Sequence, residues 1–280
     1  MLNILNPAKI KIPVTEINIC LTVAFILFSV FTSAHSEPLQ VPPMGNKETG
    51  SFITSYKDGG VRWKADWTME QFEENKEKRI KLVLKGKGIN SPFTEETTWE
   101  AVSTWKTEGE FQPIDAVTTY RDMSGEVIMT EKKTFDSQSG VSVFERFYVQ
   151  QNKKLIEQFE TRSCTLILEG IVLALRTLPF STQESLTTNL LTNEPELYKV
   201  EFEQKGVETI KTPQGEIVCY KVELVPKLGL LGVFKVFFPK TYFWFTVEAP
   251  HTWVRYEGLE NGLGTPEVVM EVTKFDTSSN

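Results

Sequence analysis

The sequence predicts a mainly β fold, a curved antiparallel half-barrel or open barrel wrapped around one apolar α-helix. Stretches of alternating apolar and polar residues, separated by turn signals, follow one another through most of the chain. One leucine-rich segment, residues 164–178, instead has helical spacing and is apolar on three sides. A helix of that kind must be buried, and the predicted strands are the material that can cover it.

The predicted strands begin with a hairpin. Residues 51–57 and 61–69 flank Asp58-Gly59-Gly60, a strong hairpin turn signal. In residues 80–85, Ile80, Leu82 and Leu84 alternate with polar side chains. Further strands are expected at residues 98–106, 116–121, 127–135, 141–149, 198–204, 207–211, 217–224, 240–247, 252–257 and 268–275, with a polar connection over residues 181–197.

The central helix is expected to begin at Cys164 and end at Leu178, because Pro179 cannot continue it. Its narrow polar stripe contains Arg176, so Arg176→Ala should destabilise the fold less than truncation of an apolar helix residue. Gly170 leaves room for a close neighbour. At 1.5 Å per residue the segment is roughly 24 Å long, and its two charges also argue against a membrane crossing.

The first 36 residues are predicted to be a signal peptide. Lys9 and Lys11 precede an apolar run over residues 17–31, and Ala34-His35-Ser36 supplies a small-residue cleavage site. An uncleaved N-terminal anchor is the alternative. Residues 37–47 are expected to form an extended, Pro-rich leader, and residues 48–276 a single β-rich domain. The predicted location is the periplasm.

The charge of the chain argues against nucleic-acid binding. The formal charge is −7, and loss of residues 1–36, with two Lys and one Glu, makes it −8. No basic stripe interrupts this acidic composition, and phosphate contacts need clustered Lys and Arg. After signal removal no transmembrane helix is expected.

Two cysteines follow the predicted signal peptide, and an exported pair invites a disulfide interpretation. Alternation places Cys219 with Lys221 and Glu223, opposite the apolar face of its strand. Cys164 begins the predicted buried helix. We therefore expect free thiols.

The sequence offers little material for catalysis. The chain beyond residue 36 has one histidine, His251, in a turn after Ala249-Pro250. It could serve as a general base beside Arg255 and Glu257, but a turn histidine is the simpler interpretation. No nucleophile elbow, dinucleotide-binding glycine motif or Cys-x-x-Cys motif occurs. We expect no catalytic residue, metal site or cofactor.

Tryptophans and one apolar stretch are the binding candidates. Trp63 and Trp67 share one strand face, and Trp244 and Trp253 lie on consecutive strands. They form either a ligand platform or ordinary core. Residues 228–238, LGLLGVFKVFF, form either a buried strand or an apolar lip on the concave face. The predicted ligand-binding residues are Leu230, Leu231, Phe234, Phe237, Trp244 and Trp253.

Three segments resemble a bacterial exported family defined as a domain of unknown function. They are LRTLPF at residues 175–180, GVETIKTPQGEIVCYKVEL at 206–224 and FWFTVEAPHTWVRYEG at 243–258. The resemblance is strongest from Leu175 to Val272. It implies a half-barrel akin to that of periplasmic lipoprotein carriers, and it supplies no catalytic residues.

Together these observations predict an exported, non-catalytic protein that binds or carries an apolar, lipid-like envelope ligand in its concave face. A protein-interaction module in envelope assembly is the first alternative. A hydrolase with an unrecognised active site is the second.

Overall fold

The computed structural model describes residues 39–161, 165–180, 182, 185–212, 215–227 and 239–278. These residues belong to one compact unit, Ser36–Asn280. Within the described ranges, no helix has the length and apolar character needed to cross a membrane.

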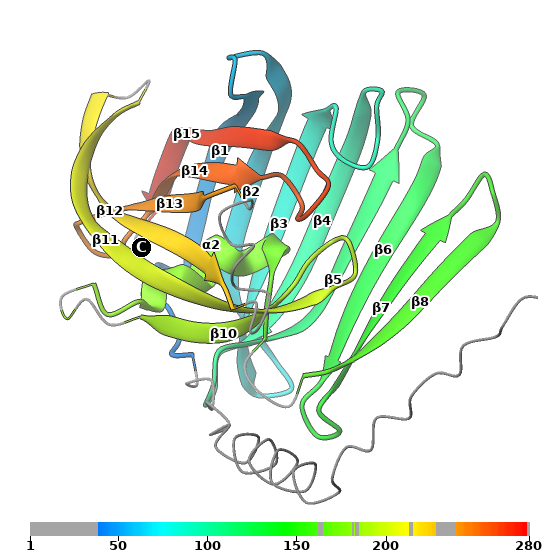
Figure 1. Ribbon diagram of the computed structural model, residues 1–280. Helices are drawn as coiled ribbons and strands as arrows, with labels where there is room; N and C mark the ends of the chain where they lie inside the picture. The colour runs from blue at the N-terminus through cyan, green and yellow to red at the C-terminus, as the bar shows by residue number, and fades with distance from the viewer. Residues whose placement is uncertain are drawn as a thin grey trace, which may run out of the picture. The chain divides into compact units, whose positions relative to one another are not determined.

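One large, open and curved sheet contains every strand of the described residues, in the order β8-β7-β6-β5-β4-β3-β2-β1-β15-β14-β13-β12-β11-β10-β9 (Figure 1). Neighbouring strands are antiparallel except for β9 and β10, which are parallel. The chain starts in the middle of the sheet and proceeds outward to β8. It continues at the other edge and returns inward, so that the last strand pairs with the first. The predicted half-barrel is confirmed.

The strands have the following bounds: β1 Lys47–Tyr56, β2 Val61–Glu74, β3 Glu77–Gly88, β4 Thr97–Lys106, β5 Gln112–Arg121, β6 Val127–Asp136, β7 Val141–Tyr148, β8 Lys153–Glu160, β9 Thr165–Ile167, β10 Leu186–Leu191, β11 Leu197–Thr212, β12 Gly215–Pro226, β13 Thr241–Thr246, β14 Trp253–Leu259 and β15 Glu267–Ser278. The helical turns are η1 Leu168–Gly170, α2 Ile171–Ala174 and η2 Leu175–Thr177.

Tight turns follow from local sequence. The hairpin between β2 and β3 turns at Asn75 and Lys76, which both have positive φ, and Glu74 pairs with Glu77. Two consecutive positive φ angles match the right-handed twist of the flanking strands. Gly59 supplies the positive φ of the predicted β1–β2 hairpin.

The central helical segment is shorter than predicted. It runs from Leu168 to Thr177, because Thr165–Ile167 forms β9 instead. Two of those three residues are β-branched, and they gain a partner strand in β10. The C-terminal end is as predicted: Leu178 is extended, with ψ 136°, directly before Pro179. Cys164 lies outside the described residues.

This segment is nevertheless the centre of the core. Ile171, Leu173, Ala174 and Leu175 are buried with the inner face of the sheet. Gly170 packs directly on the ring of Trp105, where an added Cβ would lie 2.0 Å from a ring carbon. Arg176 differs from the expectation. It is buried and paired with Glu48 at 2.7 Å, so its removal would leave a buried carboxylate without its cation.

Three strands differ from the prediction by more than their end residues. Residues 198–204 and 207–211 form one strand, β11, in which Gly206 marks a bulge in the pairing with β12. β10 lies inside the predicted polar connection. It was not predicted because Thr188, a polar residue, takes a core-facing position between two leucines and obscures the apolar–polar alternation. β8, largely exposed at the sheet edge, was also not predicted.

In the leader, residues 39–46 have no regular structure, but Leu39 is buried in the core.

Glycines make room for tryptophans on the inner face. Trp67 lies across Gly50 of β1, and Trp99 lies across Gly86 of β3, each glycine being its cross-strand partner. An added Cβ at Gly86 would lie 2.2 Å from the Trp99 ring. Small residues on neighbouring strands thus let large rings lie flat on a curved sheet.

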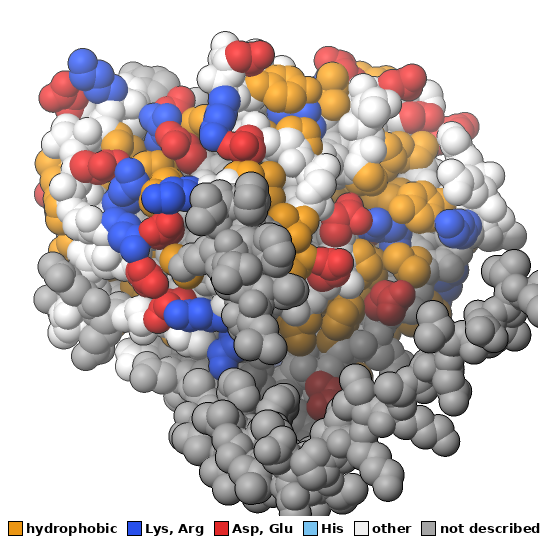
Figure 2. Space-filling model, in the orientation of Figure 1, with side chains coloured by type: hydrophobic (Ala, Val, Ile, Leu, Met, Phe, Trp, Pro, Cys, Tyr) orange, Lys and Arg blue, Asp and Glu red, His pale blue; other side chains and the backbone are white. Residues whose placement is uncertain are grey.

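The opposite, outer face carries a second, small apolar cluster. It contains Ile210, Cys219, Trp244 and Val254. Lys221 lies 5.0 Å from the Trp244 ring centroid and covers it from the solvent side. Figure 2 shows acidic and basic side chains interspersed over β11–β13, at the left of the view.

Candidate functional site

A cavity of about 270 Å³ lies between the inner face of the sheet and the helical segment. Most of its lining is apolar. Strands from both halves of the sheet contribute, together with η1, α2 and the loop between β14 and β15. The sheet supplies Trp63 and Trp253, and the helical segment supplies Ile171 and Val172.

Four aromatic rings form one wall of the cavity. Phe52 lies between Trp63 and Trp253, at ring-centroid distances of 5.4 and 5.3 Å, and both contacts are edge-to-face. Trp99 extends the row, 5.5 Å from Trp63. These contacts lock the rings into a rigid apolar surface, because edge-to-face geometry is the favoured arrangement of aromatic pairs.

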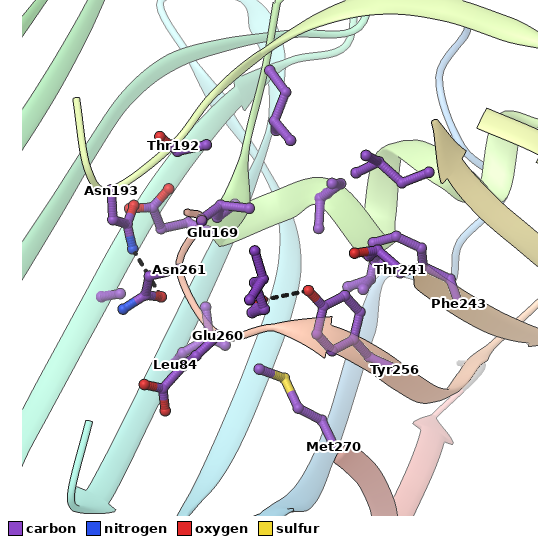
Figure 3. A pocket seen from close by; sticks show the side chains of 18 of the residues that line it. Leu84, Glu169, Thr192, Asn193, Thr241, Phe243, Tyr256, Glu260, Asn261 and Met270 are labelled. Atoms are coloured by element: carbon purple, nitrogen blue, oxygen red, sulfur yellow. Dashed lines mark hydrogen bonds between the residues drawn. The ribbon is translucent and has the colours of Figure 1, made fainter. Parts of the chain in front are cut away.

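One end of the cavity is polar. Figure 3 shows Glu169, Thr192, Asn193 and Asn261 gathered there, with Thr241, Phe243, Tyr256 and Met270 toward the other end. Asn193 comes from the loop between β10 and β11, and its Nδ2 donates to Asn261 Oδ1. The cavity is therefore amphipathic, with a long apolar wall and a polar end.

Buried charges stand behind this polar end. Lys133 of β6 donates from its Nζ to Glu169 Oε1 at 2.6 Å and to Asn193 Oδ1. Arg146 of β7 pairs with Glu131 and donates to the Asn193 carbonyl. Burial raises the pKa of Glu131, and the neighbouring Arg146 and Lys133 oppose that rise.

A second buried network anchors the loop between β14 and β15. The Glu260 carboxylate accepts hydrogen bonds from the Arg62 guanidinium, the Trp63 indole and both the backbone N–H and the hydroxyl of Ser91. Asn261 Nδ2 donates to the Ser91 carbonyl at 3.0 Å. These bonds fix the loop at the rim, where Leu263 is exposed.

Comparison with known families gives one informative result. Residues 53–273 match the family model DUF3108, described as a protein of unknown function. The chain belongs to the DUF3108 family. The predicted resemblance to a family of unknown function is thereby confirmed. The match includes Trp63, Trp99 and Trp253 of the aromatic wall, and it begins one residue after Phe52.

Two solved structures are also similar, at low identity. One is a proposed exported protein with a YmcC-like fold from Bacteroides fragilis, with 10% identity and a TM-score of 0.33. The other is a proposed lipoprotein from Parabacteroides distasonis, with 8% identity and a TM-score of 0.28. Each comparison covers 86% of this chain and 100% of the other. Comparison with curated proteins gives no match.

The predicted ligand-binding residues lie in different parts of the molecule. Trp253 lines the cavity. Trp244, on the neighbouring strand, belongs to the outer cluster and does not line the cavity. Their separation follows from strand alternation, because Phe243 faces inward and Trp244 therefore faces outward. The predicted apolar lip, with Leu230, Leu231, Phe234 and Phe237, lies outside the described residues.

Sequence reasoning missed the polar end of the cavity. Its residues come from η1 and the loops after β3, β10 and β14, which are far apart in the sequence. A local signal existed for Glu169, which is an acidic residue inside an otherwise apolar segment. The pairing with Lys133 could not be seen, since it depends on how far the sheet curves.

His251 has the position of a turn residue. Its Nδ1 lies 3.0 Å from the Thr246 carbonyl oxygen, and its ring packs against Phe180 and Tyr220. Arg255, by contrast, pairs with Glu257 and Glu271. Within the described ranges, no cluster of His, Cys, Asp and Glu is arranged to hold a metal ion.

Proposed function

We propose that this protein is exported to the periplasm and binds or carries an apolar, lipid-like envelope molecule in the cavity, without catalysing a reaction. The observation that carries the proposal is the cavity itself, with its rigid wall of Phe52, Trp63, Trp99 and Trp253. Large apolar pockets with a few convergent polar groups are the usual form of small-molecule sites.

The same aromatic side chains belong to the hydrophobic core and line the cavity. Trp63 and Trp99 are almost fully buried, yet both line the cavity. A ligand with an alkyl chain would add contacts to side chains that already hold the fold together. Burial of its methylenes would supply about 0.8 kcal/mol each, which is sufficient for useful affinity with a short chain.

A matched pair of substitutions tests the proposal. Leu84 and Val83 are neighbours on β3 and are both half-buried, but Leu84 lines the cavity and Val83 does not. Leu84→Trp should fill the cavity and weaken binding of a fluorescent fatty-acyl probe at least tenfold. Val83→Trp should leave probe affinity unchanged.

Thermal unfolding of both variants is the control for the fold. Equal loss of probe binding in two folded variants would show that the probe binds elsewhere. If the parent binds no acyl probe and instead captures one dominant envelope protein, the interaction module becomes the better explanation. Turnover in a hydrolase panel would favour the enzyme.

The exported location depends on a separate observation. Lys9 and Lys11, the apolar run and Ala34-His35-Ser36 form a signal-peptide pattern, and these residues lie outside the described ones. N-terminal sequencing of the protein from the cell envelope should begin at Glu37. A sequence beginning at Met1 would exclude cleavage and favour the retained anchor.

A further inference from the structure

The polar end of the cavity presents two unused hydrogen-bond acceptors. Asn90 Oδ1 and Glu169 Oε2 are buried and have no hydrogen-bond partner among the described residues. Asn90 is 7% exposed, the Glu169 side chain is 7% exposed, and both residues line the cavity. A buried acceptor without a donor is costly, and a donor on a ligand would remove that cost.

The two acceptors belong to one connected polar group. Glu169 and Asn193 share the Lys133 ammonium group, Asn193 donates to Asn261, and Asn261 donates to the carbonyl of Ser91, next to Asn90. Figure 3 shows Glu169, Asn193 and Asn261 side by side at this end. The head group of an amphiphilic ligand is therefore expected at this end of the cavity.

The cations of this region lie behind the lining. Lys133 is only 1% exposed, does not line the cavity and is already paired with Glu169. Arg62 is likewise behind Glu260, whose carboxylate is used by several donors. The surface that faces the cavity at the polar end is therefore acceptor-rich and carries a carboxylate. Among the described residues it offers a carboxylate or phosphate no unpaired cation.

Among the described residues, Arg176 is the one guanidinium in the lining, and it lies away from the polar end. It follows Glu169 by seven residues, about 10 Å along a helical segment. Its charge is matched by Glu48, which is fully buried. Its Nε has no hydrogen-bond partner among the described residues, but an anionic head group there would meet a charge that Glu48 already matches.

From these contacts we infer that the ligand is an amphiphile with an uncharged, hydroxyl-bearing head, as in a monoacylglycerol. Its hydroxyls donate to Asn90 Oδ1 and Glu169 Oε2, and its acyl chain lies along the wall of Phe52, Trp63, Trp99 and Trp253. This inference rests on the proposed function and adds the class of head group. It predicts discrimination among lipids that have identical chains.

Three lauryl probes separate charge from hydrogen bonding. Monolaurin is uncharged and has donor hydroxyls. Methyl laurate is uncharged and has no hydroxyl, and laurate is an anion. Competition with a fluorescent acyl probe should rank monolaurin first, at least tenfold tighter than laurate and about threefold to tenfold tighter than methyl laurate. Equal affinity for all three would overturn the head-group inference and leave the proposed function standing. Laurate as the tightest probe would also overturn it. Failure of all three to bind would overturn both proposals.

Substitutions locate the preference. Asn90→Ala removes one acceptor and should weaken monolaurin about threefold to tenfold while leaving methyl laurate unchanged. Glu169→Gln keeps the shape and an acceptor for Lys133, and it should reduce the discrimination against laurate. Glu271→Gln, on the outer face beside Arg255, is the control and should change neither preference. If Asn90→Ala and Glu169→Gln both fold and keep the parent's relative affinities for the three probes, the polar end does not bind the head group.

Discussion

Ion pairs around the cavity and ion pairs on the outer surface differ sharply in burial. Arg62–Glu260 and Arg176–Glu48 contain side chains that are at most 5% exposed. On the outer surface, the side chains of Lys85 and Glu100 are 65% and 49% exposed. Removing one partner of a buried pair leaves an uncompensated charge in the interior, whereas exposed pairs are screened by water.

The comparison shows which polar residues are structural and which are available. Glu260 accepts hydrogen bonds from three different residues, so it fixes a loop and has little left for a ligand. Glu169 keeps one oxygen unused. The same residue type therefore has two roles around one cavity, and hydrogen-bond accounting separates them.

The largest expected effect is the loss of Glu260. Glu260→Ala leaves Arg62 buried without its carboxylate and should lower the free energy of unfolding by about 3–5 kcal/mol. Glu100→Ala, which breaks an exposed pair, should cost less than about 1 kcal/mol. Urea unfolding of both variants measures the difference. Similar losses in the two variants would contradict the distinction between the two kinds of pair.

Two leucines of the helical segment give the next largest effect. Leu175 is fully buried, and Leu175→Ala should cost about 2–5 kcal/mol. Leu168 is half-buried beside existing empty space, so Leu168→Ala should cost less. Thermal unfolding should separate the two. If neither substitution changes the melting temperature, the helical segment is not the centre of the core.

A glycine under a tryptophan should have a smaller effect. Gly86→Ala forces the Trp99 ring to move and should cost about 1–3 kcal/mol. Gly60→Ala, whose nearest atom would be 3.5 Å away, should be close to neutral. Since Trp99 lines the cavity, Gly86→Ala should also weaken acyl-probe binding. Unchanged stability and binding would show that the ring does not depend on this glycine.

The smallest effect concerns a reaction rate, not stability. Burial raises the pKa of Cys219 to about 11, so the fraction of reactive thiolate at pH 8 is very small. A Cys164→Ser variant of the mature protein should react slowly with a thiol reagent at pH 8, and fast after unfolding. In the parent, unfolding without reductant should release two reactive thiols. No reactive thiol before reductant is added would indicate a disulfide between Cys164 and Cys219.

Strand alternation and turn chemistry made most of the sheet predictable from the sequence. Residues 51–57 and 61–69 were found because Asp58-Gly59-Gly60 is a local signal. β10 was not, because Thr188 faces the core between leucines. The predicted helix was too long at its start, because Thr165–Ile167 gained a partner strand that no local pattern shows.

The site was less predictable than the sheet. Trp63 and Trp253 were recognised as candidates from composition and spacing, and both line the cavity. Strand alternation would have placed Trp244 on the outer face of the sheet if the sequence had shown which residue of β13 faces inward. The polar end brings together residues far apart in the sequence. It could not be predicted without knowing how the whole sheet curves.

The central claim is that the cavity holds an apolar molecule, and the most direct measurement is mass spectrometry of the lipid extract of purified protein. Protein isolated without detergent from the envelope should carry one class of acyl lipid in near-stoichiometric amount. The same lipid should be present in Val83→Trp and absent from Leu84→Trp. A parent protein free of lipid, or equal lipid in both variants, would contradict the account.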